Sequence, residues 1–384
     1  MATSHRLRVG ITAAAGAIAV LSWLGCSRDQ SEPTAPHNEQ VSSARSARQQ
    51  DLGAAIAAKD RHAAQVLKTQ GVAGVAVGRT SDGRAAVVIL TTASGIAGLP
   101  ANLDGIPVVV QVTGAIVALP LQAPDAATRG RGLVKPSGEF AHPVPIGVST
   151  SNVTANTAGC ATGTIAARVT DGAHVYALSV NHIYALTNSA AANSAVVQPG
   201  LLDDDCVLGG IARVRDPDGP NDASDVIGTL ASFQTIAFCS DPTTCPNTID
   251  AAIALSSTAN LGKATPSNGY GTPSSTTAAA SIGQVLEKYG RTSALTTGKV
   301  AAIDGTVMVD YGGGNIAEFV HQIVITSGGF SKAGDSGSLV VAVDGLHPVG
   351  LLFAGSKNVT IANPIDDVLA AGGVASFSLT VDGS

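Results

Sequence analysis

The feature that most constrains the fold of this chain is a series of short β-forming runs between residue 146 and the C-terminus. Residues such as Val, Ile, Ala and Thr dominate these runs, turn-forming residues separate them, and no long helical pattern lies between them. The predicted strands are 163–169, 174–180, 210–215, 226–232, 249–255, 282–288, 298–303, 306–311, 317–326, 338–343 and 348–354. Many short strands without crossover helices predict an all-β barrel or sandwich pair rather than a parallel sheet.

Length and charge limit what else the chain can be. Its 384 residues exceed the usual size of one domain, and 45% hydrophobic with only 13% charged residues indicates buried cores, so we expect two domains. The net charge of −6 gives no basic surface for nucleic acid, and no basic amphipathic stretch suits a membrane surface. We therefore expect no nucleic-acid partner, membrane contact through a lipid anchor at most, and a monomer.

The N-terminus predicts export. Arg6 and Arg8 precede an apolar run over 11–25 that is too short to span a bilayer, which is typical of a signal peptide over residues 1–26. The run ends in Trp23-Leu24-Gly25-Cys26, which looks like a bacterial lipobox and would place a lipid on Cys26. Ordinary signal cleavage is the alternative. Either route predicts an exported protein, lipid-anchored in the cell envelope or secreted or periplasmic.

Three segments follow the signal. Residues 27–47 are polar and predict a disordered tether. A helical pattern followed by strands predicts a small α/β domain over 48–119, and a Gly, Pro and Arg-rich stretch predicts a linker over 120–145 that is open to proteolysis at Arg129 and Arg131. The small domain could be a pro-region, removed after folding, or a permanent substrate-recruiting module.

Cysteine parity supports export. Setting Cys26 aside leaves Cys160, Cys206, Cys239 and Cys245, which predicts two disulfides. Cys239 and Cys245 enclose a short turn and are expected to pair, leaving Cys160 with Cys206, although three connectivities are formally possible. Free or metal-binding thiols are the alternative, but no C-x-x-C spacing or histidine cluster indicates zinc. We expect no metal and no cofactor.

The most specific motif is Gly334-Asp335-Ser336-Gly337. A serine nucleophile needs a tight turn with backbone N–H groups aimed at the developing oxyanion, and flanking glycines permit that turn. Ser338 stands where an α/β-hydrolase elbow has glycine, and a strand rather than a helix follows, so that fold is excluded. An ordinary Gly/Ser-rich hairpin turn is the alternative.

A histidine and an aspartate complete a candidate triad. His182 ends a predicted strand in Ser179-Val-Asn-His182, and Asp250 abuts the apolar run 251–255, where a buried carboxylate needs a partner. Taken singly, His182 could be structural and Asp250 a turn residue. As a set with Ser336 they supply a nucleophile, a general base and a carboxylate that orients the base.

With its glycine-flanked serine and its His, Asp, Ser chain order, the stretch 146–384 resembles the trypsin-like (chymotrypsin-fold) bacterial serine proteases. Its Asn-His motif is closest to that of the poorly characterised trypsin-like proteins of bacteria and plants. The family's catalytic motifs differ here at Ser338 and before His182, where the usual glycine and Thr-Ala-Ala are absent. The resemblance implies an all-β double β-barrel (chymotrypsin/trypsin-like) preceded by the small α/β N-terminal domain.

The resemblance also implies roles for neighbouring residues. The N–H groups of Gly334 and Ser336 would form the oxyanion hole, and Arg291 would pair with Asp335 to support the turn. Phe330 would lie at the floor of the specificity pocket. Residues Phe353, Ala354 and Gly355 would pair with an extended substrate by strand addition.

These inferences predict an exported serine endopeptidase acting on protein or peptide substrates through His182, Asp250 and Ser336. A catalytically silent cell-envelope binding or assembly protein on the same fold is the alternative. An esterase that uses the same triad is a third reading.

Overall fold

The computed structural model describes residues 37–118, 134–154, 160–203, 207–208, 211–212, 224–326 and 328–384. The predicted signal peptide, Cys26, Cys206, Arg129 and Arg131 lie outside these residues. By its internal contacts the chain divides between Arg45 and Ser46. Helix α1 (His37–Leu67) begins inside the segment 27–47 that was expected to be a tether, because a formed helix extends readily by one hydrogen bond per residue.

The strands at the C-terminal end close into a ring. In order around it lie β15 (Val285–Gly290), β18 (Leu339–Ala342), β19 (Pro348–Gly355), β20 (Val359–Pro364), β17 (Ile316–Thr326) and β16 (Ala294–Asp310), and β15 pairs with β16 to complete it. Strand β19 is buried throughout. Leu352 and Phe353 belong to different core clusters, since successive side chains point to opposite faces. The ring is one of the two barrels predicted.

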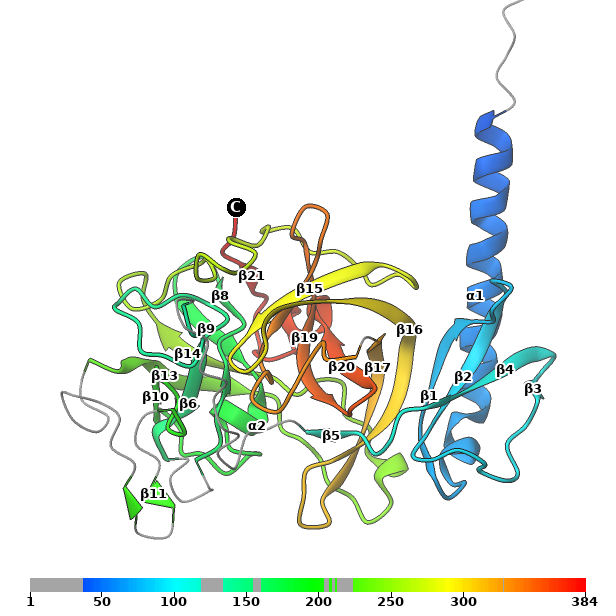
Figure 1. Ribbon diagram of the computed structural model, residues 1–384, viewed down its shortest axis with the longest axis horizontal. Coiled ribbons are helices and arrows are strands. Elements are labelled where there is room, and N and C mark those ends of the chain that lie inside the picture. The colour runs from blue at the N-terminus through cyan, green and yellow to red at the C-terminus, as the bar shows by residue number, and fades with distance from the viewer. Residues whose placement is uncertain are drawn as a thin grey trace, which may run out of the picture. The chain divides into compact units, whose positions relative to one another are not determined.

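A second, antiparallel sheet is built from strands that precede β15, with the C-terminal strand β21 at one edge (Figure 1). Its order is β21 (Thr380–Val381), β8 (Ala167–Thr170), β9 (Val175–Ser179), β14 (Ala252–Ser256), β13 (Val226–Phe233), β10 (Ala195–Val197), β6 (Ser149–Asn152) and β7 (Gly163–Thr164). Strand β7 pairs with β6, and the chain runs within a few residues into β8, which pairs with β9. This sheet therefore curves back on itself as a second barrel.

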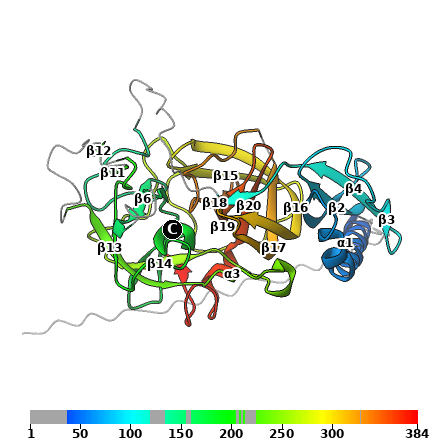
Figure 2. The same ribbon diagram turned by 90° about the horizontal axis from the view of Figure 1, so that it is seen from below.

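The strands before residue 119 join the first of these sheets (Figure 2). They are β1 (Val72–Arg79), β2 (Ala85–Thr91), β3 (Asn102–Leu103), β4 (Ile106–Val112) and β5 (Val117–Ala118). Strand β1 pairs with β16, and β5 pairs with both β16 and β19. Helix α1 packs on β1 and β2 through Ala58 and Val66. These strands thus share a sheet with the barrel, and α1 covers one of its faces.

The smaller elements are the helices α2 (Asn181–Tyr184), η2 (Pro242–Thr244) and α3 (Ile365–Leu369) and the hairpin of β11 (Val207–Leu208) and β12 (Ile211–Ala212). None of the helices among the described residues is both long and apolar enough to cross a membrane.

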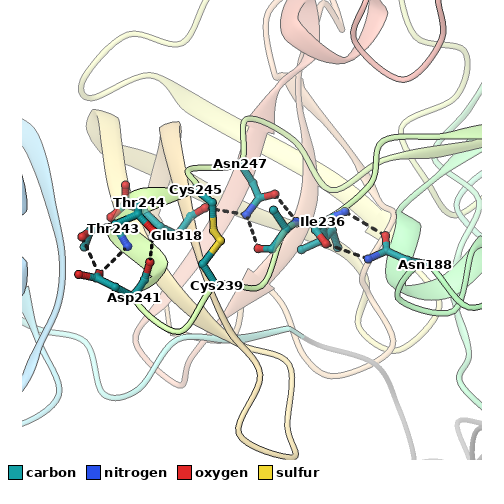
Figure 3. Close-up of a disulfide and its surroundings, with 10 residues drawn as sticks. Asn188, Ile236, Cys239, Asp241, Thr243, Thr244, Cys245, Asn247 and Glu318 are labelled. Atoms are coloured by element: carbon teal, nitrogen blue, oxygen red, sulfur yellow. Dashed lines mark hydrogen bonds between the residues drawn. A yellow bond between two sulfur atoms is a disulfide. The ribbon is translucent and has the colours of Figure 1, made fainter.

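The predicted disulfide between Cys239 and Cys245 is present and closes the loop that contains η2 (Figure 3). Asn247 fastens this loop to β17, because its backbone N–H donates to the carbonyl of Glu318 at 2.8 Å and its side chain bonds both Ala237 and Glu318. Cys160 is also disulfide-bonded. Its expected partner, Cys206, is outside the described residues.

Replacing Cys239 and Cys245 together by serine should lower the free energy of unfolding by about 2 kcal/mol, since the short closed loop removes little entropy from the unfolded chain. Urea unfolding of the double variant against the parent protein measures the change. A loss of stability above about 4 kcal/mol would show that the loop folds only when it is cross-linked.

Candidate functional site

The strand register of the second sheet brings His182 and Asp250 together. Strand β9 pairs antiparallel with β14, with Ser179 opposite Ala252. His182 lies on α2, just after β9, and Asp250 lies just before β14. Extending the register past the paired residues places these two side chains side by side. Because each residue lies next to one of two paired strands, the pairing of β9 with β14 is enough to bring them together.

The two side chains form a buried hydrogen-bonded dyad. His182 Nδ1 lies 2.6 Å from Asp250 Oδ2, and the side chains are 1% and 0% exposed. A carboxylate only accepts hydrogen bonds, so Nδ1 carries the proton and Nε2 is left with its lone pair. Among the described residues Nε2 has no hydrogen-bond partner. This is the arrangement a general base requires.

Asp250 has further partners in the first barrel. The hydroxyl of Tyr311 donates to Oδ2 at 2.8 Å, and the side-chain amide of Asn363 bonds the backbone N–H and C=O of Asp250. Burial beside the Asp250 carboxylate raises the pKa of Tyr311 well above its usual value, so the phenol remains a donor. The carboxylate is therefore held from both sheets.

Ser336 stands on a turn that touches the other sheet. Gly334 and Gly337 have φ values of 91° and 92°, a region that glycine adopts without strain. A Cβ on Gly337 would lie 2.2 Å from the carbonyl oxygen of Thr164, and the Thr164 N–H donates to the Ser336 carbonyl at 2.8 Å. The turn can approach β7 this closely only because residue 337 has no side chain.

The same contacts bring the serine near the dyad. A Cβ on Gly163 would lie 2.7 Å from a side-chain carbon of Ile183 and 2.8 Å from the Ser336 carbonyl oxygen. His182 is the neighbour of Ile183, so the dyad and the serine meet at β7. The serine hydroxyl nevertheless donates to the carbonyl of Phe353 at 3.2 Å, and no bond joins it to His182. Neither the Gly334 nor the Ser336 N–H donates to another described residue.

A histidine–aspartate dyad on one barrel lies near a serine turn on the other, with β19 beside that turn. The chain has the chymotrypsin-like serine protease fold. No protein-family model matches the sequence, and no curated protein matches it.

Solved structures of chymotrypsin-like proteases resemble the chain with TM-scores of 0.40. A glutamic acid-specific serine protease is 22% identical, and the match covers 62% of this chain and all of that one. Protease A of Thermobifida fusca is 14% identical over 62% of this chain and all of its own. The chymotrypsin of Cellulomonas bogoriensis is 15% identical over 63% of this chain and 99% of its own.

Asp335 is the anchor of the serine turn, but its cation is Lys288 rather than the predicted Arg291. Lys288 Nζ lies 3.4 Å from Asp335 Oδ2, and both side chains are fully buried. The carboxylate also accepts the N–H groups of Thr292, Ser293 and Lys332. Burial lowers the pKa of the Lys288 ammonium, and the Asp335 charge opposes that shift.

Arg291 forms a different pair. Its guanidinium binds Asp203, with Nε 2.8 Å from Oδ2, and its backbone N–H donates to Thr164 at 3.1 Å. The prediction that it pairs with Asp335 was wrong, because the backbone N–H groups after it, together with Lys288, occupy that carboxylate. Arg291 instead ties the β15–β16 turn to the second sheet.

The predicted substrate residues differ in their surroundings. Phe330 is 1% exposed and packs in the barrel core with Leu286 and Val300, so its ring stabilises the barrel instead of forming an open pocket floor. Ala354 and Gly355 pair with Ala118 and Val117 of β5. The edge expected to receive substrate therefore already carries a strand of the same chain.

Sequence reasoning missed Lys288, Tyr311, Asn363 and β5. Lys288 had one usable signal, since it ends the predicted strand 282–288 and lies on the same face of it as Leu286. Tyr311 and Asn363 carry no local motif.

Replacing Lys288 by methionine should lower the free energy of unfolding by about 3 kcal/mol, because Asp335 would keep a buried charge without its cation. Urea unfolding measures the loss, and adding Asp335→Asn should recover part of it. Lys263→Met is the matched control, since Lys263 Nζ donates to the Gly383 carbonyl from a less buried position. Equal losses in the two lysine variants would contradict a special role for the Lys288–Asp335 pair.

Proposed function

We propose that the protein is an exported serine endopeptidase that hydrolyses peptide bonds through Ser336, His182 and Asp250. The observation that carries the proposal is the buried dyad, in which Asp250 fixes the tautomer of His182 and leaves Nε2 free to accept a proton. Export through residues 1–26 and lipid attachment at Cys26 belong to the same proposal, and the Cys239–Cys245 disulfide supports an oxidising compartment.

The chemistry follows from the positions of these groups. Ser336 Oγ attacks the peptide carbonyl carbon while its proton passes to His182 Nε2, and the Gly334 and Ser336 N–H groups bind the oxyanion. His182 then protonates the leaving amine, which departs as the C–N bond breaks and an acyl-enzyme remains. Water, deprotonated by His182, attacks the ester, and the acid leaves as His182 returns the proton to Ser336 Oγ. Asp250 orients His182 and stabilises the imidazolium through its hydrogen bond to Nδ1.

We further propose that residues 48–118 act as a pro-region. The uncleaved chain is then the latent form of the protease. Strand β5 lies antiparallel to β19 at Ala354 and Gly355, where an extended substrate would add as a strand. Asp310 N donates to the carbonyl of Ile116 at 3.0 Å, and Ser356 Oγ donates to that of Thr113 at 2.6 Å. Ser336 itself is fully buried. Cleavage in the linker 120–145 would let this segment leave.

A catalytically silent binding or assembly protein is the second candidate. The observation that favours it is that the Ser336 hydroxyl bonds Phe353 and not His182. A catalytic serine–histidine pair often tightens only when substrate is bound, which is why the hydrolase remains the first candidate.

Covalent labelling by a fluorophosphonate probe tests the hydrolase. The processed protein should label, and Ser336→Ala and His182→Ala should abolish labelling because each removes part of the nucleophile–base pair. Each variant should unfold at the same urea concentration as the parent protein, which shows that loss of labelling is not loss of folding. No labelling of a folded, disulfide-bonded protein, before or after cleavage of the linker, would favour the binding protein.

Labelling of the uncleaved chain tests the pro-region. Ala118→Asp puts a charge into a buried contact of β5 and should raise the labelling rate of the full-length protein at least tenfold by releasing the segment from β19. Val110→Asp is the control, because Val110 is 49% exposed on β4. Equal rates for the parent and Ala118→Asp proteins would show that β5 does not limit access.

A further inference from the structure

Tyr311 lies where the two barrels meet the dyad, yet nothing in the proposed mechanism uses it. It follows β16 directly, and its backbone N–H donates to the carbonyl of Asn315 at 2.9 Å across a tight glycine-rich turn. The residue therefore belongs to the barrel that carries Ser336, whereas Asp250 and His182 belong to the other sheet.

The phenol and the imidazole share one carboxylate oxygen. Asp250 Oδ2 accepts His182 Nδ1 at 2.6 Å and the Tyr311 hydroxyl at 2.8 Å, while Oδ1 faces the His182 backbone N–H at 3.3 Å. With donors on both oxygens, the carboxylate has a fixed orientation. Since His182 is oriented by that carboxylate, a change in Asp250 rotates the base.

Aromatic contacts fix the position of the Tyr311 ring. It meets the His182 ring edge-on with centroids 6.0 Å apart, meets Phe238 in the same way at 5.4 Å, and stacks on Phe319 at 6.2 Å. Phe238 directly precedes the Cys239–Cys245 loop, whose attachment to β17 through Asn247 is drawn in Figure 3. The hydroxyl is thus aimed by a packed cluster.

We propose that Tyr311 is a positioning residue, a fourth member of the His182–Asp250–Ser336 set that holds the base in its reactive orientation through Asp250. This proposal rests on the proposed hydrolase function. The charged or titratable groups in contact with the phenol are Asp250 and His182, and both belong to the dyad.

The position also links the base to β5. Asp310, next to Tyr311, pairs with Val117 and donates its N–H to the Ile116 carbonyl. Release of β5 would free the backbone next to the phenol at the same time as the substrate edge.

A double-mutant cycle in the processed protein tests the role. Tyr311→Phe removes the hydroxyl and keeps the ring, and should lower the fluorophosphonate labelling rate roughly tenfold, the effect of one hydrogen bond to a charged group. In an Asp250→Asn background it should have no further effect, because the phenol acts through that carboxylate. Equal falls in both backgrounds would overturn the proposal, since a general structural defect is additive.

Two further variants keep the test sharp. Tyr176→Phe is the matched control, because the Tyr176 hydroxyl also donates to a carboxylate, that of Asp171 at 3.0 Å, and should leave the rate unchanged. Phe238→Leu loosens the Tyr311 ring without deleting its hydroxyl, and should lower the rate by less than Tyr311→Phe. This variant serves if Tyr311→Phe does not fold, and an unchanged rate in it would count against the cluster.

Proton NMR of the His182 Nδ1–H separates this proposal from the proposed function. That resonance, identified by its loss in His182→Ala, should shift in Tyr311→Phe and stay in place in Tyr176→Phe, whether or not the protein labels. A shift in a protein that never labels would uphold the positioning and reject the hydrolase. An unmoved resonance would overturn the positioning.

Discussion

The buried carboxylate of Asp250 is the group on which the rest of this site depends. A charge with no exposure is stable only when several donors replace water, and here they come from both barrels: His182 from one and Tyr311 from the other. Asn363 adds a pair of hydrogen bonds to the Asp250 backbone. Because hydrogen bonds to this one carboxylate come from both barrels, they also hold the two barrels together at the site. This explains why a residue without any motif, Tyr311, lies beside the base.

A second buried pair, Asp335 with Lys288, holds the turn that carries the serine. Asp335 accepts backbone N–H groups from two segments and is neutralised by Lys288 from β15, so the turn around Ser336 is fastened to the barrel wall. Arg291 then joins that wall to Asp203, which lies in a turn, and to Thr164 of the other sheet. Each half of the candidate site is held around its own buried carboxylate, and glycines at 163 and 337 let the halves come into contact.

The N-terminal strands make a third set of contacts with the site, through their pairing with β16 and β19. Strand β1 continues the sheet of β16, which positions β5 along the free side of β19. A strand edge offers unpaired N–H and C=O groups to any extended chain, and in this protein an earlier segment of the same chain takes them. This side of β19 and the backbone beside Tyr311 are covered by one element, β5.

Much of the fold was predictable because it depends on local sequence patterns. Short apolar runs with turns between them predict antiparallel strands, although 298–303 and 306–311 proved to be one long strand, β16, whose irregular register passes through Asp304-Gly305 without a break. Ser336, His182 and Asp250 could be singled out as candidates because a glycine-flanked serine, a strand-end histidine and an acid before an apolar run are each visible in local pattern.

The sequence by itself determined the β architecture, the serine turn and the Cys239–Cys245 loop, because each depends on residues close together in the chain. It also marked His182 and Asp250 as candidates through their immediate neighbours. Only the tertiary structure decided that Lys288 and not Arg291 neutralises Asp335, that Phe330 packs in a core, that Tyr311 reaches Asp250 and that β5 lies on β19. Those contacts join distant segments, and charge compensation in a buried site depends on which groups the fold brings within a few ångströms, which no local pattern encodes.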